Sequence, residues 1–191
     1  MSALYLYRLI ISTAVLTCLA AINAGSQSNL FYVASSSVKF RSEAPLEIIS
    51  AESDKMQGII DVSKRSFAFS VLNSSFEGFN SELQKEHFNE NYMESDKFPS
   101  TVFKGKIIED IDFSKDGTYN LRAKGFLTVH GIVDERIIKA TLVVKDNELK
   151  LHSKFNVLLK DHNIRVPKVV HEKIASEILV ELNATLNKEQ N

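Results

Sequence analysis

The side chains that could bind a metal ion are spread singly along this chain. The histidines are His87, His130, His152, His162 and His171. No two of them have the spacing of one helical turn or one strand repeat, which would aim both rings at the same ion. The sequence therefore predicts no zinc site and no metal cofactor.

The individual histidines have simpler roles. We expect His152 on the wet face of a strand and His162 and His171 near loops, so all three should be solvated. His130 lies at the corner of a predicted hairpin, where its ring can bind backbone carbonyl groups or meet the head group of a ligand. We favour the structural role for His130.

The sequence also lacks the signature of a hydrolase. No Gly-x-Ser-x-Gly motif is present, and the serines lie in loops without a base or an orienting carboxylate beside them. We therefore expect a non-enzymatic protein, with lipid hydrolysis as the weakest alternative. The carboxylates of Glu86, Glu90 and Glu94 recur at every fourth position, with Asp96 nearby. We interpret them as a solvated helix face rather than an acid/base cluster or a calcium site.

Residues 1–24 have the composition of a secretory signal peptide. Arg8 is their one charge, an apolar run extends from Leu9 to Ile22, and Ala24 provides a small residue at the end. The run is shorter than the ~20 residues that a transmembrane helix needs. We therefore expect a periplasmic or secreted protein, with residues 25–191 as its mature chain.

The single cysteine, Cys18, lies inside that segment. Cleavage after Ala24 would leave a mature chain without thiols or disulfides. The alternative is that Cys18 carries the lipid anchor of a lipoprotein, although Thr17 is not the small residue usual before such a cysteine. Removing Arg8 from the 23 basic residues leaves 22 against 24 acidic ones, so we expect no nucleic-acid partner.

Alternation of apolar and polar residues predicts strands with one buried face. The clearest are Tyr119 to Val129 and Leu149 to Leu159. Further apolar sets at this period are Val38/Phe40, Met56/Gly58/Ile60/Val62, Phe67/Phe69/Val71, Phe103/Gly105/Ile107, Ile138/Ala140/Leu142/Val144 and Ile178/Val180/Leu182/Ala184/Leu186. Together these give about eight strands. Turn residues at Ser63 to Arg65, Lys115 to Gly117 and Asp146-Asn147 favour antiparallel hairpins.

Such strands can close into a barrel or stack as a sandwich, and periodicity alone leaves both open. Small residues on the apolar faces would leave room inside a barrel. They are Gly58, Gly105, Ala123, Gly125, Ala140 and Ala184. The alternative is that the glycines only permit bends or bulges in the strands.

One short helix is predicted from about Ser81 to Tyr92, with Ser81 as its cap and Gln84 completing a capping box. It should lie across one end of a barrel. The residues expected to turn inward are Leu83, His87, Phe88, Tyr92 and Met93. Pro99 then holds Phe98 in an extended conformation and starts the next strand.

Three motifs carry a resemblance to a known family. They are the stretch from His87 to Gly105, which contains the specific run Tyr-Met-Glu-Ser-Asp-Lys-Phe-Pro, then Gly125 to Gly131, and Val166-Pro167. In these motifs the chain resembles the YceI-like proteins, extracytoplasmic lipocalin-like β-barrels that bind polyisoprenoids and related lipids. The likeness spans Val33 to Leu186, and only Phe40 to Pro45 and Asp110 to Thr118 depart from the pattern.

The resemblance implies an all-β fold, a single antiparallel lipocalin-like barrel in one domain over residues 25–191, with the short helix near its mouth. Its interior would be an apolar tube. The residues expected to line it are Phe67, Phe69, Phe103, Leu127, Phe155 and Val157, with Phe88, Tyr92, Met93 and Phe98 near the helix-capped end. Aromatic residues on a strand face can equally belong to a packed core.

Polar residues at the mouth would contact a ligand head group. The candidates are Tyr92, His130, Asp161, His162 and Arg165. The last three belong to a loop that resembles the family's Asp-containing loop before its Val-Pro pair. The alternative is that Asp161 and Asn163 only form a turn.

The expected ligand is a polyisoprenoid, an isoprenoid quinone or another long-chain amphiphile, held without a covalent cofactor. Burying roughly 500 Å² of its tail would contribute about 12 kcal/mol before ordering costs. The rival hypothesis is an envelope stress or interaction protein with a packed core and a working exterior surface. Transient contact with a membrane or an envelope protein, and a dimer, are compatible with either hypothesis.

Overall fold

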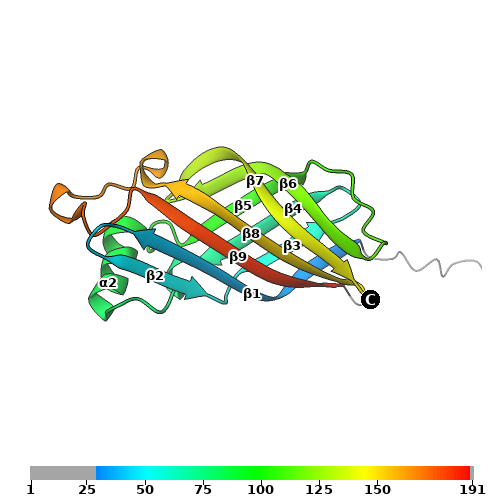
Figure 1. Ribbon diagram of the computed structural model, residues 1–191, viewed down its shortest axis with the longest axis horizontal. Helices are drawn as coiled ribbons and strands as arrows, with labels where there is room; N and C mark the ends of the chain where they lie inside the picture. The colour runs from blue at the N-terminus through cyan, green and yellow to red at the C-terminus, as the bar shows by residue number, and fades with distance from the viewer. Residues whose placement is uncertain (1–28, 190–191) are drawn as a thin grey trace, which may run out of the picture.

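The computed structural model describes residues 29–189, which form one antiparallel sheet that closes on itself (Figure 1). The strands are β1 (Leu30–Glu43), β2 (Ile48–Ser53), β3 (Gln57–Asp61), β4 (Ser66–Leu72), β5 (Ser100–Ile107), β6 (Gly117–Val129), β7 (Ile132–Lys145), β8 (Glu148–Leu158) and β9 (Glu177–Lys188). They follow the order β2-β1-β3-β4-β5-β6-β7-β8-β9, and β1 also pairs with β9, which closes a barrel of eight strands. The predicted antiparallel barrel is confirmed, and the sandwich is excluded.

Short helical segments gather at one end of the barrel, which we call the helix-capped end. They are the 3₁₀ turns η1 (Asn73–Ser75), η3 (Leu159–His162) and η4 (Lys168–Val170), the α-helix α2 (Glu82–His87) and the π-helical turn η2 (Phe88–Tyr92). The opposite end, where β7 turns into β8, we call the closed end. No helix within residues 29–189 is long and apolar enough to span a membrane.

The strand β2 was not predicted from the sequence. It and β3 pair with β1 in one continuous register, with Val38 opposite Ser53 and Phe31 opposite Ile60. They are therefore two parts of one strand, interrupted between Ser53 and Gln57. Only β3 is also paired with β4. Beside β2 the sheet is replaced by the segment that carries α2, which joins β2 through an isolated bridge between Glu52 and Glu77.

Two tight hairpins depend on left-handed backbone conformations. His130 (φ 49°) and Gly131 (φ 71°) join β6 to β7, and Asp146 (φ 50°) and Asn147 (φ 62°) join β7 to β8. Positive φ at both central residues defines the type I′ turn, whose twist matches that of paired strands. The hairpin predicted at Asp146-Asn147 is confirmed.

The inward glycines do not leave room for a ligand. Gly105 of β5 lies opposite Gly125 of β6, and a Cβ added at either would overlap the backbone of the other strand. A Cβ at Gly58 would overlap the ring of Phe69. These glycines therefore allow two backbones, or a backbone and a ring, to approach closely, and the pairing of β3 through β6 keeps its register across them without a bulge.

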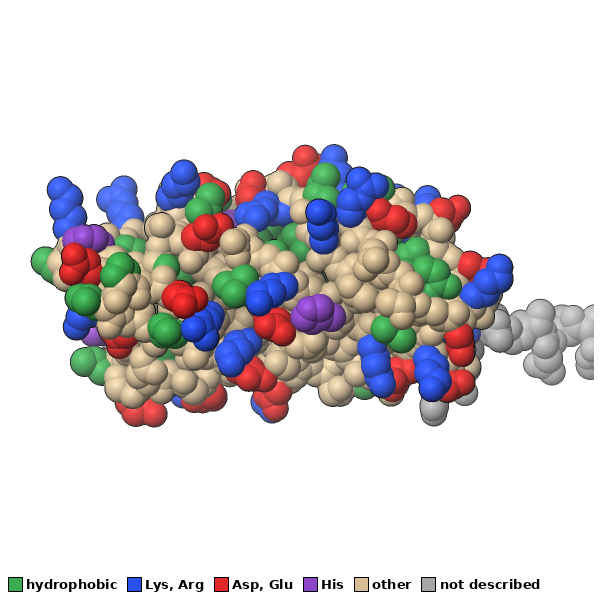
Figure 2. Space-filling model, in the orientation of Figure 1, with side chains coloured by type: hydrophobic (Ala, Val, Ile, Leu, Met, Phe, Trp, Pro, Cys, Tyr) green, Lys and Arg blue, Asp and Glu red, His purple; other side chains and the backbone are tan. Residues whose placement is uncertain are grey.

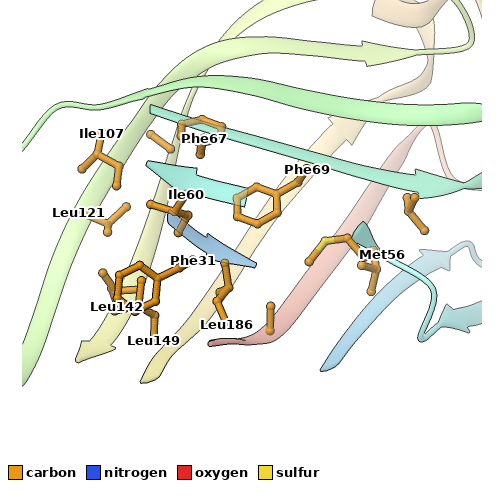
Figure 3. Close-up of a cluster of buried hydrophobic side chains, with 14 of the residues drawn as sticks. Phe31, Met56, Ile60, Phe67, Phe69, Ile107, Leu121, Leu142, Leu149 and Leu186 are labelled. Atoms are coloured by element: carbon orange, nitrogen blue, oxygen red, sulfur yellow. The ribbon is translucent and has the colours of Figure 1, made fainter. Parts of the chain in front are cut away.

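The closed end is tightly packed (Figure 3). The side chains of Leu142, Leu149 and Leu186 are completely buried there, with exposed fractions of 0%. Phe67 belongs to the same cluster, packs against Phe103 at 4.9 Å between ring centroids, and is only 6% exposed. The prediction that Phe67 lines a ligand tube was wrong, because its ring is used to fill the barrel.

The helix α2 begins as predicted but is shorter. The backbone N–H of Gln84 donates to Oγ of the cap Ser81 at 3.3 Å, while Oε1 of Gln84 accepts from the N–H of Asn80 at 3.2 Å, one residue before the cap. After His87 the chain continues as the π-helical turn η2. The extended corner at Phe98 is held by Asn73, whose Nδ2 donates to the Phe98 carbonyl at 2.7 Å.

Candidate ligand-binding cavity

An apolar cavity of about 500 Å³ occupies the helix-capped half of the barrel. This volume is within the range of pockets that hold small organic ligands. From the strands, its lining includes Phe69, Phe103, Leu127, Phe155 and Val157; from the segment between β4 and β5, it includes Phe76, Phe79, Phe88, Tyr92 and Met93. Several lining residues also belong to the large buried cluster; among them Phe69 and Met56 lie nearest its closed-end members in Figure 3, and we call these two the floor of the cavity.

Four phenylalanines join the helical cap to the barrel wall. Phe40 of β1 stacks on Phe88 with ring centroids 5.2 Å apart. Phe76 and Phe79 contact both rings at centroid distances between 5.2 and 5.9 Å. Aromatic pairs at such distances stabilise packing beyond the area that they bury. All four rings line the cavity, so the cap is part of the cavity wall.

Three of these rings were missed by sequence reasoning. Phe40 alternates with Val38 but falls in a segment that departs from the family pattern. Phe76 and Phe79 lie outside helices and strands, where no periodicity marks a buried residue. The available signal was the density of phenylalanine between residues 76 and 88 in an otherwise polar stretch, which indicates a loop that packs inward.

The cavity brings together most of the apolar residues that were predicted for it. Those in its wall are Phe69, Phe88, Tyr92, Met93, Phe103, Leu127, Phe155 and Val157. Phe67 and Phe98 lie elsewhere. Phe98 packs edge-on against the ring of His130, with centroids 4.7 Å apart, in the space left by Gly131. Phe98 therefore packs against the β6–β7 hairpin and does not line the cavity.

Of the polar residues predicted at the mouth, only Tyr92 lines the cavity. Asp161 and Arg165 are exposed and lie outside the lining. Asn163 ends η3 in a left-handed conformation (φ 56°), and its N–H donates to the Lys160 carbonyl at 3.3 Å. This geometry matches the alternative in which Asp161 and Asn163 form a turn.

His130 has a structural role. Its Nδ1 lies 3.0 Å from the carbonyl oxygen of His162, and its Nε2 lies 2.6 Å from Oε2 of Glu94. A carbonyl and a carboxylate can only accept, so both bonds form together only when both ring nitrogens carry a hydrogen. His130 thereby ties the β6–β7 hairpin to η3 and to the end of the cap. The expectation that Glu94 belongs to a purely solvated carboxylate face was wrong, because Glu94 contacts this imidazole.

His162 is completely buried, with an exposed fraction of 0%. The expectation that it is a solvated loop residue was wrong, because η3 turns the side chains of His162 and Ile164 inward. Neither ring nitrogen has a hydrogen-bond partner among the described residues. Burial lowers the pKa of His162, and the Ile132 backbone and the Asp134 carboxylate only partly oppose this shift. The ring is therefore held neutral inside the barrel wall.

The polar side chains in the cavity wall mostly have partners within the protein. Oγ of Ser42 accepts from the N–H of Ala175 at 2.9 Å, and Oδ1 of Asn73 accepts from Oγ1 of Thr101 at 2.9 Å. Burial raises the pKa of the Tyr92 hydroxyl, which therefore stays neutral near physiological pH. Within residues 29–189, no three His, Asp or Glu side chains converge as a metal site. The lining is thus mostly apolar, and its ionisable side chains are those of Glu47, His87, Tyr92 and Lys173.

Comparisons with known proteins agree with this architecture. The family model described as the YceI-like domain matches residues 31–186. The fold resembles a polyisoprenoid binding domain from Saccharophagus degradans, with a TM-score of 0.72 and 8% identity over 86% of this chain and 100% of that one.

Two other solved structures are similar. BcnA from Burkholderia cenocepacia matches with a TM-score of 0.64 and 14% identity, over 78% of this chain and 95% of that chain. The YceI protein of Campylobacter jejuni matches with a TM-score of 0.53 and 12% identity, over 69% and 78% of the two chains. At these identities the structures share the fold. A search of the curated proteins gave no match.

Proposed function

The chain belongs to the family of YceI-like domains, and on that basis we propose that it carries or sequesters a long-chain amphiphile inside its barrel. The ligand class we propose is a polyisoprenoid, an isoprenoid quinone or a related lipid. The observation that carries the proposal is the mostly apolar cavity of about 500 Å³, in which the lining groups Ser42, Asn73 and Thr101 are hydrogen-bonded within the protein.

A hydrocarbon tail fits this chemistry better than a polar ligand. A polar ligand would have to replace the internal hydrogen bonds of the wall, and each buried polar group left unpaired costs about 1–3 kcal/mol. An apolar tail gains about 25 cal/mol for each Å² removed from water and disturbs none of these bonds. Because the cavity ends at Met56 and Phe69, the tail would occupy the helix-capped half only.

The head group would remain at the entrance. His87 and Lys173 line the cavity and are exposed, so they mark its opening, and Tyr92 is a partly buried lining residue; together they offer an imidazole, a cation and a neutral hydroxyl. Selectivity among tails would be weak, since one methylene changes affinity by only about 1 kcal/mol. We therefore infer that discrimination between lipids depends on the head group.

The proposed protein is non-enzymatic and works outside the cytoplasm. Export is supported by the composition of residues 1–24, which lie outside the described residues, as does Cys18. The rival hypothesis of a packed interaction protein requires a filled barrel, and the cavity favours a carrier over it.

The proposal is tested by identifying the bound molecule. Native mass spectrometry of protein purified from its own envelope fraction, followed by solvent extraction, should reveal a stoichiometric prenyl or acyl lipid. Protein purified without lipid should take up a prenyl lipid such as geranylgeraniol from solution. A clean apo mass combined with no uptake would contradict the carrier function.

A matched pair of substitutions tests where the lipid lies. Val157 points into the cavity and is 7% exposed, whereas Val133 points outward from β7 and is 60% exposed. Val157→Phe fills part of the cavity, so we expect uptake to fall by about tenfold or more. Val133→Phe should leave uptake unchanged. Equal uptake by both variants would show that the lipid binds elsewhere.

A further inference from the structure

We propose that the helix-capped end docks on the surface of an anionic lipid bilayer through an apolar rim around the cavity mouth. The rim consists of Leu46, Ile48, Leu83 and Val169. The proposal rests on the carrier function above, because it supplies the surface across which the lipid would enter and leave the cavity. Figure 2 shows hydrophobic side chains and lysine or arginine side chains together at this end of the molecule.

The rim residues are large, apolar and exposed to water. The exposed fractions are 91% for Val169, 67% for Leu46, 57% for Leu83 and 47% for Ile48. They come from three segments: η4, the turn between β1 and β2 that continues into β2, and α2. Leu83 also lines the cavity, as do Val170 beside Val169 and Glu47 between Leu46 and Ile48. The apolar residues therefore border the opening through which a lipid would pass.

Hydrogen bonds join these three segments into one surface. The backbone N–H of Leu46 donates to the Glu172 carbonyl at 2.8 Å, which connects the β1–β2 turn to the loop that contains η4. On the other side, Nδ2 of Asn80 donates to the Ile48 carbonyl at 3.0 Å, and Nε2 of Gln84 donates to Oε1 of Glu47 at 2.5 Å. The rim is thus held as a unit rather than formed by independent loops.

The charge around Val169 is the reason to choose an anionic bilayer as the partner. The loop between β8 and β9 carries four exposed cations and only two carboxylates, Asp161 and Glu172. The cations are Lys160, Arg165, Lys168 and Lys173. None of the four forms a salt bridge among the described residues, unlike Lys85 and Lys97 at the cap, which pair with carboxylates. Exposed apolar residues flanked by cations are typical of segments that insert at the interface of anionic membranes.

The distribution of charge around the mouth predicts how the helix-capped end is oriented on the bilayer. Glu82 and Glu86 make the α2 side of the mouth acidic, and both are exposed. Anionic headgroups would repel that side and attract the loop side. We therefore expect the tip at Lys168-Val169 to insert first, with Leu46 beside it and α2 farther from the surface.

The test uses the mature protein and vesicles of phosphatidylcholine, with or without phosphatidylglycerol. We expect the wild-type protein to float with the vesicles that contain phosphatidylglycerol and to be released by salt. Val169→Asp and Lys168→Glu should each weaken vesicle binding by about fivefold or more. The controls are Val133→Asp and Lys145→Glu on the outer barrel wall, which should bind vesicles as the wild type does.

Separate measurements distinguish failure of docking from failure of the carrier function. Neither Val169 nor Lys168 lines the cavity, so uptake of geranylgeraniol from solution should be unchanged in both variants while its transfer from vesicles slows. Intact uptake with no flotation by the wild type would overturn the docking proposal, as would equal flotation by Val169→Asp and the wild type. The first of these two results would assign delivery to a protein acceptor. Absence of uptake by every variant would instead overturn the carrier function. In that case the docking proposal would be decided by comparing the flotation of the wild type with that of Val169→Asp.

Discussion

His130 and His162 are neighbours at the β6–β7 hairpin, but their imidazole rings have different roles. His130 forms hydrogen bonds with two groups and links three segments, whereas His162 is enclosed without a hydrogen-bond partner among the described residues. A neutral imidazole without a partner is tolerated inside a protein, but an imidazolium there would be strongly unfavourable. The stability of the protein should therefore respond to the protonation of His162.

The first prediction concerns pH. Burial depresses the pKa of His162 in the folded state below the 6.5 of an unperturbed histidine, so the unfolded chain binds the proton more readily. The contribution of neutral His162 to stability is complete above the unfolded pKa and is lost as the pH falls toward the folded pKa. We expect the free energy of unfolding, measured by urea titration, to decrease as the pH falls from about 7.5 to about 5.5.

His162→Leu provides the control for this pH dependence, because leucine fills a similar volume and does not titrate. The slope in that interval should flatten in the variant. A separate loss should remain in stronger acid, where Asp61 and Asp112 titrate. Hydrogen bonds from Ser63 and Ser114, respectively, are the main causes that lower their pKa values from 3.8 to about 2. An unchanged slope in His162→Leu would refute the assignment.

The second prediction concerns His130. Replacing it by alanine removes two hydrogen bonds and leaves the partly buried His162 carbonyl unpaired, so we expect a loss of about 1–3 kcal/mol in unfolding free energy. His152→Ala is the matched control. His152 is exposed on β8 and bonds only to Oδ1 of Asn183, and its loss should cost less than about 0.5 kcal/mol. Equal effects of the two substitutions would contradict the linking role of His130.

At the scale of single residues, the inward orientation of a side chain could be predicted only where the residue lies in a regular strand. Alternation places Leu127, Phe155 and Val157 on the inner face without knowledge of the partner strands. His162 could not be placed in the same way, because it lies in a single 3₁₀ turn whose direction depends on the elements around it. Phe76 and Phe79 were missed for the same reason.

At the scale of elements, the cap depends on aromatic contacts more than on its own helix. A six-residue helix is too short to be stable alone. Phe88 attaches it to Phe40 of β1 and to Phe76 and Phe79 of the preceding segment. Because this attachment relies on the ring of Phe88 rather than on sheet pairing, we expect the cap to open more readily than the strands when a lipid enters.

The third prediction follows from this attachment. Phe88→Ala should lower the free energy of unfolding by about 3 kcal/mol, since it removes a ring with aromatic contacts on several sides. Hydrogen exchange should become faster in α2 and η2 while the strands of the closed end stay protected. Leu83→Ala on the same helix, where the side chain is 57% exposed, should change neither measurement appreciably. Uniformly faster exchange throughout the barrel would contradict a separately opening cap.

The missed strand β2 has a physical explanation at this scale. Its sequence begins with Ile48-Ile49, so it lacks clean alternation, and it is separated from β3 by Asp54-Lys55-Met56. It is a strand because β1 continues past β3 and provides a partner in the same register. Predicting β2 would have required the full length of β1 (Leu30–Glu43), but only Val38 and Phe40 in that range were recognised from apolar/polar alternation.

For the whole molecule, alternation predicted the buried face and the family resemblance predicted closure into a barrel. The division of the interior into a packed half and a hollow half could not be predicted. The inward faces of β8 and β9 carry apolar residues toward both ends of the barrel, such as Leu149 and Val157 on β8, so the sequence does not mark where packing ends. The boundary depends on how Met56, just before β3, and Phe69, on the neighbouring strand β4, fill the interior, which is a property of the assembled structure.

This division leads to the last prediction, which uses one strand and one kind of substitution. Leu186 and Leu182 both lie on the inner face of β9, but Leu186 is completely buried at the closed end and Leu182 is partly buried in the cavity wall. Leu186→Ala should lower the free energy of unfolding by about 3–5 kcal/mol and leave the affinity for geranylgeraniol unchanged. Leu182→Ala leaves less of a new void, because the space beside it is already open, so we expect a loss of about 1–2 kcal/mol.

The effect of lipid should separate the two halves further. Bound lipid stabilises only the folded protein, so saturating geranylgeraniol should raise the unfolding free energy of the wild type and of Leu186→Ala by the same amount. In Leu182→Ala the wall contacts the tail less closely, and the increase should be smaller. The opposite result would be a full lipid-induced increase in unfolding free energy for Leu182→Ala and a small one for Leu186→Ala. It would show that the tail reaches the closed end of the barrel instead of the cavity beside Leu182.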